Sequence, residues 1–244
     1  MADETRPTGT VRRDSTPGST EDGSRAFLRA SRAGELVVQP LGKGLYPIAD
    51  EGAYFHASNP TVGTAIVGIA AADAYDDAEA LIYIANDHAS KHVYMDFIEL
   101  TATAAGTNGT NFNYAMDVAS EATYASGGTA LTPVNTNRKS TDAAPVTMYF
   151  GAVVTTTGTT ERVVSAGRLR TVLKVIGDQY LFTFGGGQAP PMASTIMEGT
   201  AQAAIHRTCP PVVIGPGDAF CFRDFAASQS VGAQYLFNIG FWVR

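Results

Sequence analysis

Along most of this chain apolar and polar residues alternate over short distances, in the pattern typical of β-strands. In the final stretch the apolar residues at every second position are Tyr235, Phe237, Ile239, Phe241 and Val243. Side chains at i and i+2 lie on one face of a strand, so this spacing predicts a C-terminal strand with one apolar face. The opposite face is polar except for Leu236 and Trp242.

Just before that strand, two apolar runs, 210–214 and 219–222, are joined by a Gly-Pro-Gly-Asp turn. Glycine permits positive φ and proline presets a turn, so the pattern predicts a β-hairpin. In this hairpin Val213 lies opposite Phe220 and shares a face with Phe222. Both faces are apolar, whereas a hairpin with one solvated side alternates. We therefore expect its second face to be covered by another subunit.

The predicted oligomer interface consists of four residues from the hairpin and the last strand. They are Val213, Phe220, Phe222 and Trp242.

Short segments of the same kind recur at intervals of roughly ten residues, with Gly, Thr and Asn between them. One of them, 92–103, places Val93, Met95 and Phe97 on one side. Another pair, 169–176 and 180–184, flanks a Gly-Asp hairpin turn. This arrangement predicts an all-β, jelly-roll-like antiparallel β-sandwich. An immunoglobulin domain is disfavoured because no tryptophan lies between the two cysteines.

The N-terminal residues have a different composition. Residues 1–34 are rich in Thr, Ser, Gly and charge, so they cannot bury enough apolar surface to offset their ordering entropy. We expect a flexible N-terminal arm over 1–34 and one β jelly-roll domain over 35–244. The arm is either a solvated leader or a segment that orders against a neighbouring subunit or an acidic surface. Its candidate contact residues are Arg12, Arg13, Arg25, Arg29 and Arg32.

Composition narrows the classes of partner. Only 16% of the residues are charged, which indicates a neutral surface or extensive burial between subunits. The net charge of -6 argues against nucleic acid as a partner of the body. No apolar run is long enough to span a membrane, and we expect no Sec signal. We interpret Cys209 and Cys221 as small buried thiols, although a disulfide between them remains an alternative.

Searches for catalytic and metal-binding patterns give weak candidates. His88 and His92 are four residues apart, but they lie in a predicted turn and not on a helix face where both would reach one ion. Arg170 and Lys174, which follow Arg168, are interpreted as a solvated strand face in preference to a contact for an acidic patch. No nucleophile elbow or phosphate loop is present in the sequence. We expect no metal, no cofactor and no enzymatic activity.

Several short motifs resemble those of tailed-bacteriophage virion structural proteins. They are Ala-Tyr-Asp-Asp ahead of Leu-Ile-Tyr-Ile-Ala-Asn (81–86), Val-Tyr-Met-Asp-Phe-Ile (93–98), Ser-Gly-Gly-Thr-Ala-Leu-Thr-Pro-Val-Asn (126–135) and Pro-Val-Val-Ile-Gly-Pro-Gly (211–217). The resemblance covers most of 36–244. It implies a jelly-roll protein that forms homotrimers as a decoration, cement or head-fibre component of the capsid.

On this basis we expect a trimeric capsid decoration or cement protein, assembled in the host cytoplasm and located in the virion. Its partners would be its own copies and the major capsid protein or other virion proteins. One alternative is a tail, baseplate or fibre component that binds a host glycan through aromatic residues such as Tyr124 or Tyr149. A jelly-roll enzyme acting on a sugar or another small molecule is a more distant alternative.

Overall fold

The computed structural model describes residues 45–69, 74–120, 123–157, 160–185 and 202–244. The predicted arm and its five arginines lie outside these residues, as does the start of the predicted domain.

The described residues form one short helix and fifteen strands. The elements are α1 (Tyr46–Asp50), β1 (Tyr54–Ser58), β2 (Ile66–Val67), β3 (Glu79–Asn86), β4 (Val93–Ala104), β5 (Thr110–Ser120), β6 (Thr123–Ser126), β7 (Thr129–Leu131), β8 (Val134–Asn135), β9 (Val146–Thr157), β10 (Thr160–Arg170), β11 (Gln179–Phe184), β12 (Ala204–Cys209), β13 (Val213–Ile214), β14 (Asp218–Ala227) and β15 (Gln234–Val243).

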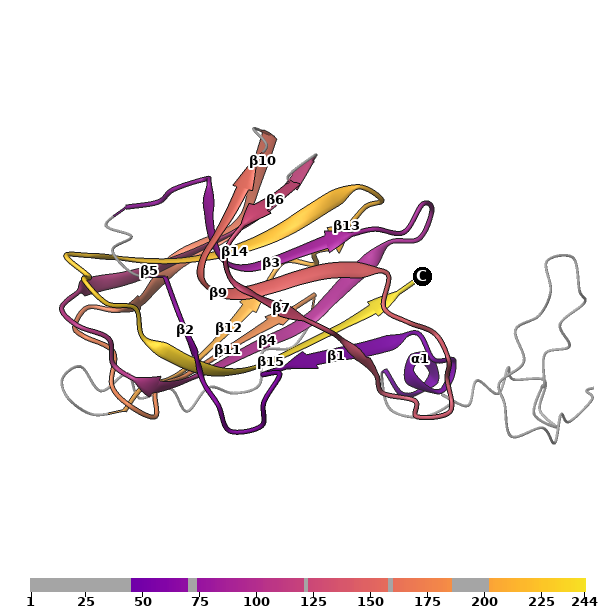
Figure 1. Cartoon of the computed structure of the whole chain (residues 1–244), viewed down its shortest axis with the longest axis horizontal. Coiled ribbons are helices and arrows are strands. Elements are labelled where there is room, and N and C mark those ends of the chain that lie inside the picture. Colours follow the sequence, from indigo (N-terminus) through magenta and orange to yellow (C-terminus); the bar gives the residue numbers. More distant parts are fainter. Residues whose placement is uncertain (1–44, 70–73, 121–122, 158–159, 186–201) are drawn as a thin grey trace, which may run out of the picture.

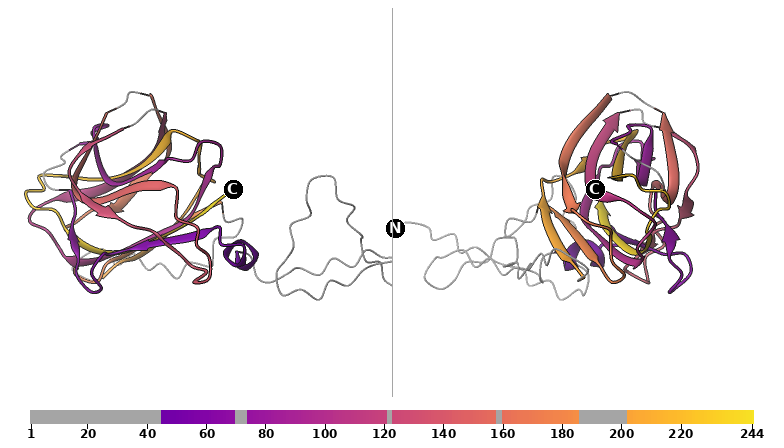
Figure 2. Two further views of the ribbon diagram at one scale, coloured as in Figure 1. Left: turned by 45° about the vertical axis from the view of Figure 1, so that its right-hand side comes forward. Right: turned by 90° about the vertical axis from the view of Figure 1, so that its left-hand side faces the viewer.

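The strands form two sheets that pack face to face, so the prediction of an all-β sandwich is confirmed (Figure 1). Sheet 1 has the order β12-β11-β4-β15-β1-β8, with β13 and β2 paired to β4 and β15. Sheet 2 has the order β10-β5-β14-β3-β9-β6, with β7 paired to β9. Seen from the side in Figure 2, the two sheets curve around a shared interior.

Eight strands account for most of the sandwich: β1, β3, β4, β5, β10, β11, β14 and β15. Within this set the order is β1-β15-β4-β11 in sheet 1 and β3-β14-β5-β10 in sheet 2. When the eight strands are numbered in chain order, sheet 1 reads first, eighth, third, sixth and sheet 2 reads second, seventh, fourth, fifth. Every pairing among these eight is antiparallel. The chain therefore crosses from one sheet to the other repeatedly. After each crossing, the apolar side chains on the inner face of the new strand pack against those of the opposite sheet.

The core lies between the sheets and is rich in aromatic rings. On β15 the alternating residues 235, 237, 239, 241 and 243 are all buried, as predicted. Phe237 stacks on Phe150 of β9 with ring centroids 4.0 Å apart. The alternation predicted for β4 holds for Val93 and Met95 but not for Phe97, because a register shift against β15 moves Phe97 to the outer face and leaves Ile98 inside.

The predicted C-terminal hairpin is wrong. Asp218 N–H does donate to the Gly215 carbonyl at 3.0 Å, so the turn exists. However, β13 pairs with β4 in sheet 1, whereas β14 lies between β5 and β3 in sheet 2. The turn carries the chain from one sheet to the other, so Val213 and Phe220 are not cross-strand partners.

The Gly-Asp turn at 177–178 behaves in the same way. The preceding strand, β10, ends at Arg170 in sheet 2, and β11 begins at Gln179 in sheet 1. Residues 171–178 are a connection between the layers and not the end of a hairpin. Turn chemistry specifies a change of direction but not the sheet that the next strand joins.

Both cysteines are buried free thiols, as the sequence predicted. Cys209 lies at the end of β12, and Cys221 lies in β14 beside Tyr83 of β3. Burial raises the pKa of the Cys209 thiol.

Candidate interaction surface

The outer face of sheet 1 carries a row of apolar and aromatic side chains across four strands. Tyr54 of β1 pairs with Trp242 of β15, which pairs with Tyr94 of β4, which pairs with Val213 of β13. Directly paired residues share a face, so the four side chains lie side by side. The rings of Tyr94 and Trp242 are stacked at 5.6 Å with an interplanar angle of 4°.

A second row lies beside the first and contains His56, Gly240 and Phe97. The rings of His56 and Phe97 are 6.4 Å apart. A Cβ atom on Gly240 would lie 2.4 Å from both the Phe97 ring and the Tyr54 hydroxyl, so the glycine leaves the space that these side chains occupy. We call Tyr54, His56, Tyr94, Phe97, Val213 and Trp242 the aromatic face.

Polar groups border and cross the aromatic face. The Tyr54 hydroxyl donates to Asp96 Oδ2 at 2.6 Å, and Asn238 Nδ2 donates to Glu99 Oε2 at 2.9 Å. Burial raises the pKa of Tyr54, and the adjacent Asp96 carboxylate raises it further. Burial also raises the pKa of Asp96, against the opposing effect of the hydrogen bond from Tyr54. Rings together with a few positioned polar groups are the chemistry of a protein–protein contact.

His56 on this face is expected to make the stability of the folded chain depend on pH. Burial lowers the pKa of His56, and this effect outweighs those of the Asn238 hydrogen bond and the Glu99 charge, which raise it. A depressed folded-state pKa means that the unfolded chain binds the proton more readily. The free energy of unfolding should therefore decrease as pH falls below about 6.5, the usual pKa of histidine.

This expectation is checked by urea unfolding of wild type and His56→Gln between mildly alkaline and mildly acidic pH. The variant should lose less stability than wild type across that interval. An identical loss in both proteins would show that His56 contributes nothing to the pH dependence.

The structure separates the four residues predicted as an oligomer interface. Val213 is 42% exposed and Trp242 is half-buried, and both lie on the aromatic face. Phe220 and Phe222 are fully buried between the sheets, so their assignment to an interface is wrong. Phe222 packs edge-on against Phe182 of β11 at 5.2 Å. The reason is the sheet change at 215–218, which turns these rings toward sheet 1 of the same chain.

Sequence reasoning missed Tyr54, His56 and Tyr94. The missing information was strand pairing, because two separate strands, β1 and β4, contribute these residues and pair with β15 on either side. A usable signal was present in the last strand, where Trp242 is the one aromatic residue on a face that is polar except for Leu236. The paired residues Tyr54 and Tyr94 lie on either side of this tryptophan.

The prediction that Arg170 and Lys174 form a solvated face is also wrong, whereas Arg168 is exposed as predicted. Arg170 is 6% exposed and forms an ion pair with Asp178 at 2.7 Å. Asp178 also accepts hydrogen bonds from the Tyr180 hydroxyl and from the backbone N–H groups of residues 175 and 203. These contacts fix both ends of the 171–178 connection inside the sandwich.

A second buried ion pair lies on the outer side of sheet 2. The Arg223 guanidinium contacts the fully buried Asp117 carboxylate. It also donates to the carbonyls of Asp76 at 2.8 Å and Asp77 at 2.5 Å and lies over the ring of Tyr75. The segment preceding β3 is thereby held across β14, which explains why β14 is buried on both faces within one chain.

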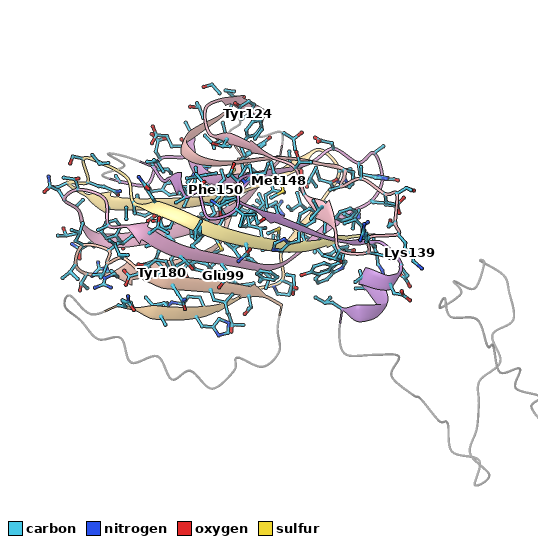
Figure 3. The ribbon with its side chains drawn as sticks, turned by 60° about the horizontal axis from the view of Figure 1, so that its bottom comes forward. Glu99, Tyr124, Lys139, Met148, Phe150 and Tyr180 are labelled. Carbon is cyan, nitrogen blue, oxygen red and sulfur yellow. The ribbon has the colours of Figure 1, made fainter. Side chains whose placement is uncertain are left out.

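Three tyrosines gather further along the outer side of sheet 2. Tyr124 and Tyr149 are stacked at 3.7 Å, and both rings approach Tyr83 of β3. Tyr83 is buried, whereas Tyr124 and Tyr149 are half-buried. Figure 3 shows Tyr124 at the margin of the molecule, beyond the strand that carries Met148 and Phe150.

A pocket of about 550 Å³ is lined by residues that follow α1 and by the C-terminal residues Val243 and Arg244. Figure 1 shows α1 and the C-terminus at the same end of the molecule. The lining of the pocket includes the charged residues Glu51, Lys91, Asp142 and Arg244 together with His88. Arg244 and Glu51 form an exposed ion pair at 3.2 Å. Acidic and basic groups are mixed in this lining, so the pocket does not indicate a ligand of one charge.

Within the described residues no group of three or more His, Cys, Asp or Glu side chains is placed to hold a metal ion. His88 lies in a turn, where its Nδ1 accepts from the backbone N–H groups of Ser90 and Lys91. None of the described helical segments is both long and apolar enough to cross a membrane.

Comparison with known proteins gives no relative. No protein-family model matches the chain, and no curated protein and no solved structure is significantly similar to it.

Proposed function

We propose that this chain is a bacteriophage virion structural protein that forms homotrimers and decorates the capsid. The observation that carries the proposal is the aromatic face, on which Tyr54, Tyr94 and Trp242 lie in one row of an otherwise regular sheet. Tyrosine and tryptophan are enriched at the energetic centres of protein interfaces. The low content of charged residues, 16%, fits a chain that covers part of its surface with other subunits.

The strand order supports the same proposal. The orders first, eighth, third, sixth and second, seventh, fourth, fifth among the eight strands, with β9 added beside β3, support the proposal of a jelly roll within the sandwich. The motif resemblance to virion proteins points to an assembly of this type. A fold alone does not specify function, so the aromatic face carries more weight than the topology.

In this function the chain acts mechanically. Copies of the aromatic face bury one another around the trimer axis, and loops or the N-terminal arm contact the major capsid protein. The arginines of the arm, which lie outside the described residues, remain proposed contacts for an acidic surface of the shell. Many small contacts of this kind hold the shell against the pressure of packed DNA.

Light scattering on purified protein tests the assembly, and co-sedimentation with undecorated phage shells tests the partner. We expect a particle mass of three chains and saturable binding to shells. A stable monomer at micromolar concentration would contradict the trimer, and trimers that ignore shells would contradict the decoration role.

One observation favours a second candidate function, a tail, baseplate or fibre component that binds a host glycan. The stacked pair Tyr124 and Tyr149 presents half-buried rings on the outer side of sheet 2, away from the aromatic face. Aromatic rings offer a flat apolar surface with a polar edge, which suits a sugar ring. Binding on a glycan array that is lost in Tyr149→Ala would favour this function over the first.

A further inference from the structure

Lys174 occupies an unusual position for a lysine. It is 1% exposed, and its Nζ contacts Asp224 Oδ2 and the Tyr235 hydroxyl. Three rings enclose the amine, those of Phe112 at 4.5 Å, Tyr235 at 4.9 Å and Tyr180 at 5.7 Å. The amine and the carboxylate thus meet in a space closed to solvent, between β14 of sheet 2 and β11 and β15 of sheet 1.

The carboxyl group of Asp224 is incompletely satisfied. Its Oδ2 accepts a hydrogen bond from the Tyr235 hydroxyl at 2.6 Å in addition to the contact with Lys174. Its Oδ1 is buried and has no hydrogen-bond partner among the described residues. A buried carboxylate normally fills its acceptor positions, because an unpaired buried charge is costly. The contact with Lys174 therefore leaves one oxygen of this buried carboxyl group unmatched among the described residues.

We propose that Lys174 and Asp224 react with each other, forming an amide bond between Nζ and Cγ that cross-links the 171–178 connection to β14.

The reaction needs no oxidant, reductant or cofactor. A proton moves from the Lys174 ammonium to the Asp224 carboxylate, which leaves a neutral amine facing a carboxylic acid. The Nζ lone pair attacks Cγ, the bond from Cγ to one carboxyl oxygen breaks, and that oxygen leaves as water with the two protons that the amine and the acid release. The product is a neutral secondary amide, which removes both buried charges.

Three features of the site favour this step. Burial lowers the pKa of Lys174, which favours the neutral amine that attacks. The Tyr235 hydroxyl donates to the carboxyl oxygen and so polarises the group under attack. The fold also holds the two reactants in contact, and positioning of this kind is equivalent to effective concentrations on the order of 10⁵ M or more.

Asp178 does not compete with Asp224 for the amine. Its oxygens accept from Arg170, the Tyr180 hydroxyl and two backbone N–H groups. Asp117, the other buried carboxylate in an ion pair, faces the guanidinium of Arg223, which is not nucleophilic. Lys174 and Asp224 are consequently the one amine–carboxyl pair buried in the part of the chain that the structure describes.

Mass spectrometry of the purified full chain, denatured and intact, tests the proposal. The expected mass is that of the unmodified chain minus one water. Trypsin cleaves after Arg170 and Arg223 but not after an acylated Lys174. The digest should contain one branched peptide in which 171–207 is joined to 224–244.

Lys174→Met supplies the variant that cannot react, and Asp117→Asn supplies the matched control. Lys174→Met should lack the branched peptide, whereas Asp117→Asn should retain it. If Lys174→Met does not fold, the wild-type digest decides alone. Recovery of the free peptide 171–174 with no branched product, or a loss of water that maps to another residue, would overturn the proposal.

Discussion

Replacing Asp117 with alanine is expected to lower the free energy of unfolding by about 3–5 kcal/mol, the typical cost of removing one partner of a buried ion pair. Asp117 is 0% exposed, and its carboxylate faces the Arg223 guanidinium. Without it, Arg223 keeps the carbonyls of residues 76 and 77 but loses the buried carboxylate that its guanidinium contacts. The loss should also loosen the segment before β3 that covers β14.

Urea unfolding at a fixed protein concentration measures this loss, because an oligomer's apparent stability changes with concentration. The matched control is Glu51→Ala, which breaks the exposed pair between Glu51 and Arg244. Surface pairs contribute about 0–1 kcal/mol, so the control should change little. Equal effects of the two substitutions would show that the buried pair has no special role.

The second large effect is expected at Trp242. If the chain forms the proposed trimer through the aromatic face, Trp242→Ala should weaken its association by about 2 kcal/mol for each contact, roughly 30-fold in Kd, as expected for an energetic centre of an interface. The indole lies between Tyr54 and Tyr94 in the row that crosses sheet 1, and it stacks on Tyr94. Its removal leaves the sandwich core untouched because Trp242 points away from it.

Sedimentation equilibrium of wild type and variant measures the change. Val62→Ala is the control, since Val62 is 98% exposed and lies outside the aromatic face. Phe222→Ala should behave in the opposite way, with a large effect on folding instead of on association. The cavity that it leaves in the core should reduce the free energy of unfolding by about 3–5 kcal/mol whether or not the chain associates. A Trp242→Ala variant with unchanged association would rule out the aromatic face as the trimer contact.

The buried ion pairs show where reading the sequence reached its limit. Arg170 and Lys174 lie close together in a stretch with several polar residues, and nothing local distinguishes them from a solvated strand. Their counter-charges come from Asp178, after a turn, and from Asp224, fifty positions beyond Lys174. A lysine is buried only where the fold brings a carboxylate to it. Its burial therefore depends on a residue far away in the chain and cannot be predicted from the residues next to it.

The four residues predicted as a subunit interface lie in two different places. Val213 and Trp242 lie on the outer side of sheet 1, where an interface with another subunit stays a prediction. The same reasoning placed Phe220 and Phe222 with them, because it assumed that the turn at 215–218 closes a hairpin. Because β13 and β14 belong to different sheets, the side on which each residue lies is set by the sheet that its strand joins. The apolar pattern of 210–222 does not determine it.

By itself, then, the sequence determined the β-rich class, the apolar face of the last strand, the positions of the turns and the burial of both thiols. Each of these depends on spacing within a few residues: the two-residue period of a strand, the φ preferences of glycine and proline, or the low polarity of a short run. Tertiary structure alone decided which sheet each strand joined, which rings faced the core and which charges met inside it. Those outcomes depend on contacts between segments far apart in the chain, and local spacing carries no information about them.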